Sequence, residues 1–111
     1  MVRPTEFKIA HRATGAGVTL SITGELDLST APVLSESIEH LRHNVKELTL
    51  DLSELMFMDS TGLRLLIELD QRAKRDEWKL AIVRPKYETA DAVLKATGAD
   101  SALPFVDAPK S

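Results

Sequence analysis

Residues 51–63 read DLSELMFMDSTGL, and they join a strand pattern to a helix pattern. Before them, residues 47–52 alternate leucine with polar residues, which is the period of a half-buried strand. After them, Leu63 and Leu66 recur at helical spacing, so we expect a helix over about 61–75. Carboxylate and hydroxyl residues, which helix starts prefer, stand at the junction. The stretch therefore predicts a strand, a loop and a helix, with polar side chains where the strand ends.

The rest of the sequence continues this alternation of patterns. Two strands of a hairpin are expected at about 6–12 and 17–23, a helix from the hydroxyls of Ser29 and Thr30 to about residue 43, a strand over 78–83, a helix over 86–97 with Thr97 inward, and a last strand over 102–106. Strands that alternate with helices imply crossovers and mostly parallel pairing after the hairpin. We predict an α/β fold, a small mixed β-sheet with helices packed on it, in the order β-β-α-β-α-β-α-β.

The composition limits the class of protein. The chain has 111 residues, the usual size of one domain, so we expect a single domain over 1–111 with its core at about 6–106 and loose ends at 1–5 and 107–111. Fourteen basic and seventeen acidic residues give a net charge of −3, which argues against a nucleic-acid partner and against an anionic membrane. With no cysteine, no signal-peptide pattern and no membrane-length apolar run, we expect a cytoplasmic protein.

The hydroxyls at the start of the second helix have two interpretations. One of them can cap the helix by accepting a hydrogen bond from a free backbone N–H group. Alternatively, the hydroxyl serves a function, because open α/β sheets place their sites at the carboxyl ends of strands. Residues 56–58 beside it are either core or an adaptable binding surface. Gly62 leaves the helix start bare, so a partner could approach the backbone closely.

At this point the sequence resembles a known family. Residues 51–63 are similar to the signature of STAS domains, specifically the bacterial anti-sigma factor antagonists. Residues 24–27, Gly-Glu-Leu-Asp, resemble the family's other motif, which comes before the first helix. The resemblance extends from about Phe7 to Val106; the long motif is specific, whereas the short one alone is weak. Family members often carry a further helix after the last strand; the sequence continues about five residues beyond Val106, so we expect this helix to be missing or vestigial.

The resemblance implies a transcriptional switch that works by partner exchange. The unphosphorylated protein would bind an anti-sigma factor that is also a serine kinase, and so free the sigma factor. The kinase would phosphorylate Ser60, with Thr61 as runner-up, and a serine phosphatase of the metal-dependent type would reverse the step. By the same resemblance, the partner-binding residues are Glu25, Asp27, Met58, Asp59, Thr61, Gly62 and Leu63.

Physical chemistry adds an expectation about the phosphate. A phosphoserine carries about −1.5 to −2 charges at pH 7. A helix start offers free N–H groups and a positive dipole end, so the fold should tolerate the charge with little rearrangement. Asp27 is either a partner contact, as the resemblance implies, or a helix-start carboxylate that the dipole favours.

Other functions find less support in the sequence. We expect no enzyme, because no pocket of convergent ionisable groups, nucleophile elbow or phosphate-binding loop is recognisable. We expect no metal and no cofactor, because the three histidines are scattered without other ligands at suitable spacing. The alternative function is a STAS scaffold, or an accessory subunit of a stress-sensing assembly or a lipid transporter. We expect a monomer or a weak dimer.

Overall fold

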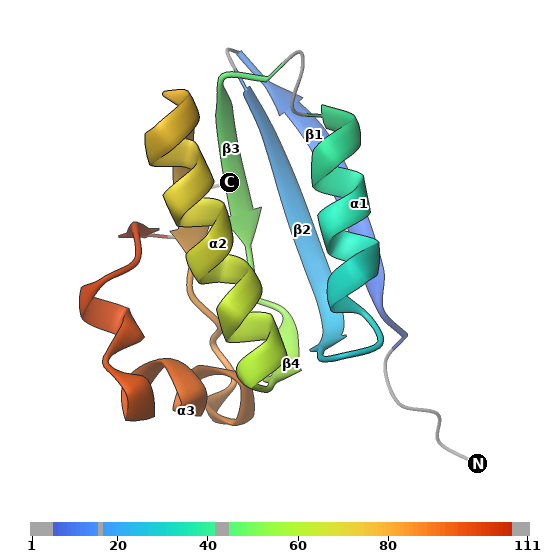
Figure 1. The fold of residues 1–111 in the computed structure, drawn as a ribbon. Coiled ribbons are helices and arrows are strands. Elements are labelled where there is room, and N and C mark those ends of the chain that lie inside the picture. Colours follow the sequence, from blue (N-terminus) through green and yellow to red (C-terminus); the bar gives the residue numbers. More distant parts are fainter. Residues whose placement is uncertain (1–5, 16, 42–44, 108–111) are drawn as a thin grey trace.

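The computed structural model describes residues 6–15, 17–41 and 45–107. The elements in chain order are β1 (Lys8–Thr14), β2 (Gly17–Leu26), α1 (Ala31–Leu41), β3 (Glu47–Asp51), β4 (Leu55–Met58), α2 (Ser60–Asp76), β5 (Lys79–Val83), α3 (Glu88–Thr97), the 3₁₀ helix η2 (Ala99–Ser101) and β6 (Phe105–Val106). Figure 1 shows α1 and α2 side by side over one face of the sheet, and α3 near the end where α2 begins. The predicted α/β class, with a mixed sheet and three helices packed on it, is confirmed.

The long strand β2 organises the sheet. It pairs antiparallel with β1 and parallel with β3, in the order β1-β2-β3-β5-β6. Its last residues, Gly24 to Leu26, pair with β4 instead of β3. Leu20 and Ile22 are buried at alternate positions of the predicted strand, and Leu26, beyond its predicted end at about residue 23, is buried as well. β2 thus pairs with both β3 and β4, which are consecutive strands in the sequence.

The strand β4 is absent from the sequence-based prediction. Its outer residues, Leu55 and Met58, are buried, whereas Met56 and Phe57 are exposed, so no period-two pattern marks it. A tight turn precedes it, in which the Ser53 N–H group donates to Asp51 Oδ1 at 3.0 Å. The predicted order β-β-α-β-α-β-α-β is therefore wrong by one strand.

Several predicted boundaries also differ from the structure. The hairpin strands run further along the chain than expected, and the last strand shrinks to Phe105–Val106 because η2 precedes it. Thr97, expected to face inward, is exposed. The predictions for residues 1–5, 42–44 and 108–111 lie outside the described residues.

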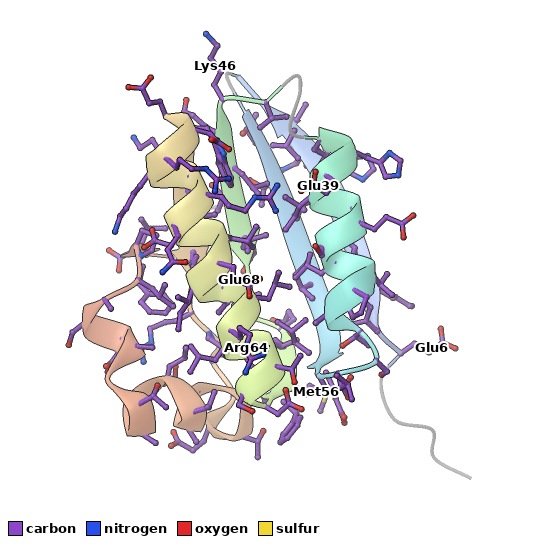
Figure 2. All side chains as sticks on the ribbon, in the orientation of Figure 1. Glu6, Glu39, Lys46, Met56, Arg64 and Glu68 are labelled. Carbon is purple, nitrogen blue, oxygen red and sulfur yellow. The ribbon has the colours of Figure 1, made fainter. Side chains whose placement is uncertain are left out.

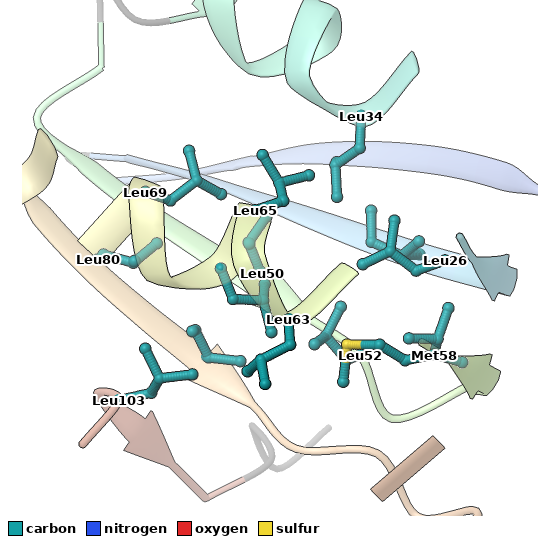
Figure 3. Close-up of a cluster of buried hydrophobic side chains, with 14 of the residues drawn as sticks. Leu26, Leu34, Leu50, Leu52, Met58, Leu63, Leu65, Leu69, Leu80 and Leu103 are labelled. Carbon is teal, nitrogen blue, oxygen red and sulfur yellow. The ribbon is translucent and has the colours of Figure 1, made fainter. Parts of the chain in front are cut away.

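The core is a cluster of aliphatic side chains between the sheet and the helices α1 and α2, as Figure 3 shows. Leu26, Leu50 and Leu52 from the strands and Leu34 and Leu66 from the helices are all fully buried. Burying a leucine side chain stabilises a fold by about 1.5 to 3 kcal/mol. This cluster fixes α2, and with it the start of α2, against the ends of the strands.

An ion pair ties α3 to the sheet. Arg84, just beyond β5, donates to Asp91 Oδ1 of α3 from Nε at 3.1 Å and from Nη2 at 2.9 Å. Asp91 is one of the few buried charged residues, and its partner satisfies it. The guanidinium also lies 5.0 Å from the centre of the Phe105 ring in β6. The charge pair therefore joins α3 and β5 at the side where β6 lies.

Gly62, in the first turn of α2, allows the helix to approach the strand ends closely. A Cβ atom at this position would lie 2.7 Å from Met58 Cγ, 2.9 Å from Leu26 Cγ and 3.0 Å from the Leu26 carbonyl oxygen. Real Cβ contacts are longer than this, so a side chain would push the helix or the strands apart. The glycine is a packing residue of the core.

We expect Gly62→Ala to destabilise the protein by about 1 kcal/mol. Alanine favours a helix over glycine by about 1 kcal/mol, but overpacking a tight contact typically costs about 1 to 3 kcal/mol. Chemical denaturation measures the difference in the free energy of unfolding. Ser60→Ala, two residues away on the exposed side, is the matched control and should change stability by less than about 0.5 kcal/mol. A Gly62→Ala protein as stable as the original would contradict this packing role.

Candidate functional site

The site lies where β2 and β4 end together. Leu26 and Met58 are paired in register, and the Asp59 N–H group continues the pairing by donating to the Leu26 carbonyl at 3.2 Å. The chain then leaves β2 through residues 27–30 into α1, and leaves β4 directly into α2 (Figure 1). Asp27 and Asp59 therefore lie on one rim, at the carboxyl ends of two parallel strands.

Asp59 caps α2. Its backbone is extended, and its carboxylate Oδ1 accepts hydrogen bonds from the Thr61 N–H group at 2.8 Å and the Gly62 N–H group at 3.3 Å. Its carbonyl accepts the first helical bond, from Leu63, at 3.1 Å. The interpretation that a hydroxyl caps this helix is therefore wrong, because the aspartate before it holds the free amides.

The Ser60 hydroxyl takes no part in the fold. Ser60 is the first residue of α2 and is exposed. None of the hydrogen bonds found among the described residues uses its side chain. Thr61, the alternative acceptor of a phosphate, is half-buried. The Ser60 hydroxyl is thus a small neutral group at the rim, with no hydrogen-bond partner in the described part of the chain.

Three of the expected partner-binding residues belong to the core. Met58 is 2% exposed, Leu63 is 8% exposed, and Gly62 is buried between Met58 and Leu26. Figure 3 shows Met58 beside Leu52 and Leu26. The expected approach of a partner to a bare Gly62 backbone is wrong, because side chains of the core fill that space. Their burial leaves little surface of these three residues for direct contact with a partner.

Asp27 organises the turn between β2 and α1. Its Oδ1 accepts hydrogen bonds from the Ser29 N–H group at 3.0 Å, the Ser29 hydroxyl at 2.8 Å and the Thr30 N–H group at 3.2 Å. The Thr30 hydroxyl points back to the strand, accepting from the Asp27 N–H group and donating to the Glu25 carbonyl at 2.7 Å. We expected the Ser29 and Thr30 hydroxyls to cap the first helix. In the structure, the Ser29 hydroxyl instead donates to the Asp27 carboxylate, and the Thr30 hydroxyl donates to the Glu25 carbonyl at the end of β2. Asp27 is half-buried and Glu25 is exposed.

These bonds lower the pKa of the Asp27 carboxyl, the Ser29 hydroxyl being the largest cause. A carboxyl whose pKa is lower in the folded state stabilises the fold when ionised. Its contribution is present above its ordinary pKa of 3.8 and is lost as the pH falls through the lowered value. At neutral pH, Asp27 is therefore a fixed negative charge on the rim.

An open groove of about 210 Å³ lies between the first turns of α1 and α2, next to Thr61. Leu28 and Pro32 line it from the side of α1, and Arg64 and Glu68 line it from α2. Figure 2 shows Arg64 and Glu68 on successive turns of α2 above the site.

Leu28, the most exposed large apolar residue of the described chain at 76%, stands at the mouth of this groove. Met56 and Phe57, at 39% and 40%, extend the apolar surface on β4. Sequence reasoning missed Leu28, Arg64 and Glu68. A leucine between Asp27 and Ser29, in a turn otherwise polar, was the available signal for the first of them.

Some kinds of site are absent from the described ranges 6–15, 17–41 and 45–107. No group of three or more histidine, cysteine or carboxylate side chains is placed there to hold a metal ion. Among these same residues, none of the helices has the length and apolar character needed to cross a bilayer.

We expect Asp59→Ala to lower the free energy of unfolding by about 1 kcal/mol, because two amides of α2 lose their acceptor. Asp59→Asn keeps a capping oxygen and should retain most of the stability. Chemical denaturation of the three proteins checks both expectations. Equal losses in the two variants would mean that the charge of Asp59, and not its cap, stabilises the helix.

We expect Ser29→Ala to raise the pKa of the Asp27 carboxyl toward 3.8, because the largest cause of the lowered value is removed. Carbon-detected NMR of the carboxyl group, followed through an acid titration, measures this value directly. An Asp27 titration unaffected by the loss of the hydroxyl would contradict the hydrogen-bonded turn.

Comparison with known proteins supplies the family. The family model described as "Mlab, STAS domain" matches residues 9–105. The chain is 31% identical to the anti-sigma-B factor antagonist of Bacillus subtilis (strain 168) over 65 residues, and 43% identical to the anti-sigma-F factor antagonist RsfB of Mycobacterium tuberculosis over 73 residues. These matches cover 59% and 65% of this chain, and 60% of each relative.

Solved structures share the fold. An anti-sigma factor antagonist from Mycobacterium paratuberculosis superposes with a TM-score of 0.81 at 23% identity, over 93% of this chain and 87% of the other. The unphosphorylated form of the anti-sigma factor antagonist SpoIIAA gives 0.74 at 20% identity, over 95% and 90%. Because the family model covers most of the sequence and the fold agrees, this chain belongs to the STAS domain family, which includes the anti-sigma factor antagonists.

Proposed function

We propose that this chain is an anti-sigma factor antagonist whose binding is switched by phosphorylation of Ser60. The unphosphorylated form binds a kinase-type anti-sigma factor and frees the sigma factor, and phosphorylation abolishes that binding. The exposed Ser60 hydroxyl, without an internal hydrogen bond among the described residues, carries the proposal. Anti-sigma factor antagonists are non-enzymatic regulators, so the covalent chemistry belongs to the partners.

Phosphorylation of Ser60 would be an ordinary phosphoryl transfer from ATP. The Ser60 oxygen forms a bond to the γ-phosphorus of ATP, the bond from that phosphorus to the bridging oxygen breaks, ADP leaves, and the hydroxyl proton passes to a base of the kinase. A metal-dependent serine phosphatase hydrolyses the phosphate ester: water attacks the phosphorus, the bond from phosphorus to the Ser60 oxygen breaks, and the Ser60 hydroxyl and inorganic phosphate are released. Because the kinase uses ATP, the proposal places the protein in the cytoplasm.

The contact surface that we propose is the rim around Ser60. It combines the carboxylates of Glu25, Asp27 and Asp59 with the apolar side chain of Leu28 and with the groove between α1 and α2. Interfaces of this kind use an apolar anchor surrounded by polar groups. The acidic rim favours a basic surface on the kinase, which steers encounter.

A phosphate on Ser60 has to act at short range. At long range, the extra negative charge would strengthen attraction to a basic partner, so simple attraction cannot explain a loss of binding. At contact, the phosphate adds bulk where a hydroxyl fitted, and its charge has to be desolvated. A hundredfold loss requires only about 2.7 kcal/mol, which one poorly paired interfacial charge can cost.

Exposure favours Ser60 over Thr61 as the acceptor. A kinase has to bring the hydroxyl into line with the γ-phosphate, and an exposed side chain permits this without a change in the fold. Ser60 is exposed, whereas Thr61 is half-buried and lines the groove between the helices. Phosphorylation by the cognate kinase followed by peptide mass spectrometry should locate the phosphate on Ser60.

We expect Ser60→Asp to bind the cognate kinase-type anti-sigma factor at least about tenfold more weakly than the original protein, which corresponds to about 1.4 kcal/mol. The carboxylate supplies part of the charge and bulk of a phosphate. Ser60→Ala should bind as the unmodified protein does and should resist inactivation by kinase and ATP. Isothermal titration calorimetry measures the affinities.

A matched control distinguishes an effect of the Ser60 position from a general effect of added negative charge. Ser101, in η2, is exposed and lies in a different part of the fold, so Ser101→Asp adds the same charge elsewhere and should bind normally. Circular dichroism checks that all variants are folded. Equal affinity of Ser60→Asp and the original protein would contradict the switch.

A second candidate function keeps the fold and changes the role. The matching family model is described by its STAS domain and does not mention an antagonist role. The second candidate is therefore the alternative considered above, a STAS scaffold or an accessory subunit of a stress-sensing assembly or a lipid transporter. Such a subunit would purify with its complex and would need no kinase. Purification of the tagged chain from its own cells distinguishes the two, since a bound kinase-type anti-sigma factor supports the switch and a bound transporter supports the subunit.

A further inference from the structure

The cation nearest in sequence to Ser60 is Arg64. Arg64 lies on α2 four residues after Ser60, is exposed, and makes no ion pair or hydrogen bond with the part of the chain that the structure describes. Side chains four residues apart on a helix are neighbours, with Cβ atoms about 5 to 6 Å apart. Helical side chains also lean toward the N-terminus, so the guanidinium of Arg64 can reach a phosphate on Ser60. Figure 2 shows it in the first turns of the helix.

The start of α2 has few free hydrogen-bond donors for a phosphate. The carboxylate of Asp59 already occupies the Thr61 and Gly62 amides, the groups that would otherwise receive an anion. The same carboxylate repels a second negative charge. Lys86, beyond β5, is already paired with Glu54 at 2.5 Å. Among the charged groups described here, Arg64 is the cation left for a phosphate at this position.

We propose that Arg64 is the built-in counter-ion of phosphorylated Ser60. The inference rests on the proposed function, because it concerns the modified form of that same serine. In the unmodified protein, Arg64 lines the groove between α1 and α2 together with Leu28 and Glu68. After phosphorylation, the guanidinium turns toward the phosphate and forms a charge-assisted hydrogen-bonded pair.

An ion pair between Arg64 and the phosphate would also change the charge of the groove between α1 and α2. Without a phosphate, Arg64 and Glu68 present one positive and one negative charge to a partner in the groove. With the phosphate, Arg64 is neutralised and drawn toward the start of the helix, which leaves Glu68 as the charge of the groove wall. Arg64 is thus a positioning residue: it couples the state of Ser60 to a surface one to two turns away.

The test is the pKa of the phosphate itself. Phosphoserine can be placed at position 60 by genetic encoding, and ³¹P NMR then follows the second ionisation of the phosphate, which is ordinarily near pH 6. A neighbouring cation favours the dianion and lowers its pKa. We expect a pKa about 0.3 to 1 unit lower in the original protein than in Arg64→Gln. Arg64→Lys, which keeps the charge, should restore most of this difference.

A lysine farther along the same helix provides the matched control. Lys74 lies ten residues beyond Arg64, about 21 Å along the helix from Ser60 and beyond the screening length at physiological salt. Lys74→Gln removes the same charge and should leave the phosphate pKa unchanged. An equal phosphate pKa in the original protein and in Arg64→Gln would overturn the inference, as would equal shifts in Arg64→Gln and Lys74→Gln. The titration needs no kinase or anti-sigma factor, so its failure is separate from a failure of the proposed switch.

Discussion

The capping of α2 by Asp59 is the interaction on which the rest of the site depends. One carboxylate oxygen accepts from the Thr61 and Gly62 amides, and these two bonds close the helix at the point where β4 ends. Because Asp59 satisfies the helix, Ser60 does not have to, and its hydroxyl is free for an outside partner. A different cap would have tied the serine into the fold. The two adjacent residues thus divide the roles between them: Asp59 caps the helix, and Ser60 carries the hydroxyl that we propose is phosphorylated.

The sheet makes this division possible by bringing two strand ends together. β2 is long enough to pair first with β3 and then with β4, so the turn at Asp27 and the start of α2 share one rim. Gly62 lets α2 lie directly on Leu26 and Met58, and this close packing fixes the position of Ser60 relative to that turn. The buried part of the rim is closely packed around Gly62, whereas the exposed part presents the Ser60 hydroxyl to solvent. A switch that acts at the interface, with little internal change, is consistent with such a base.

The sequence predicted the parts of the fold that have a clear period. Alternating leucines predicted β3, and helical spacing predicted α2. The strand β4 could not be predicted, because its buried residues stand at its two ends and its register shifts between Gly24 and Glu25. Its hydrogen bonds, and not its side-chain pattern, make it a strand.

The position of the candidate residues in the fold was predictable, and their contacts were less so. The sequence predicted polar side chains where a strand ends, and the structure has Asp59 and Ser60 at the end of β4, with Ser60 exposed. The capping role of Asp59 could have been read from the preference of aspartate for the cap position. Burial of Met58, Gly62 and Leu63 depends on contacts with β2 that only the three-dimensional arrangement reveals. The same holds for the groove in which Leu28 and Arg64 meet across two helices.

The most direct test of this account follows the Thr61 and Gly62 amide protons by NMR while a phosphate on Ser60 is titrated. If Asp59 keeps the cap, both amides stay bonded to its carboxylate, and their chemical shifts change little as the phosphate gains its second charge. If the phosphate takes over the helix start, both amide signals will move strongly downfield and titrate with the phosphate. That second result would contradict the division between a structural aspartate and a chemically free serine.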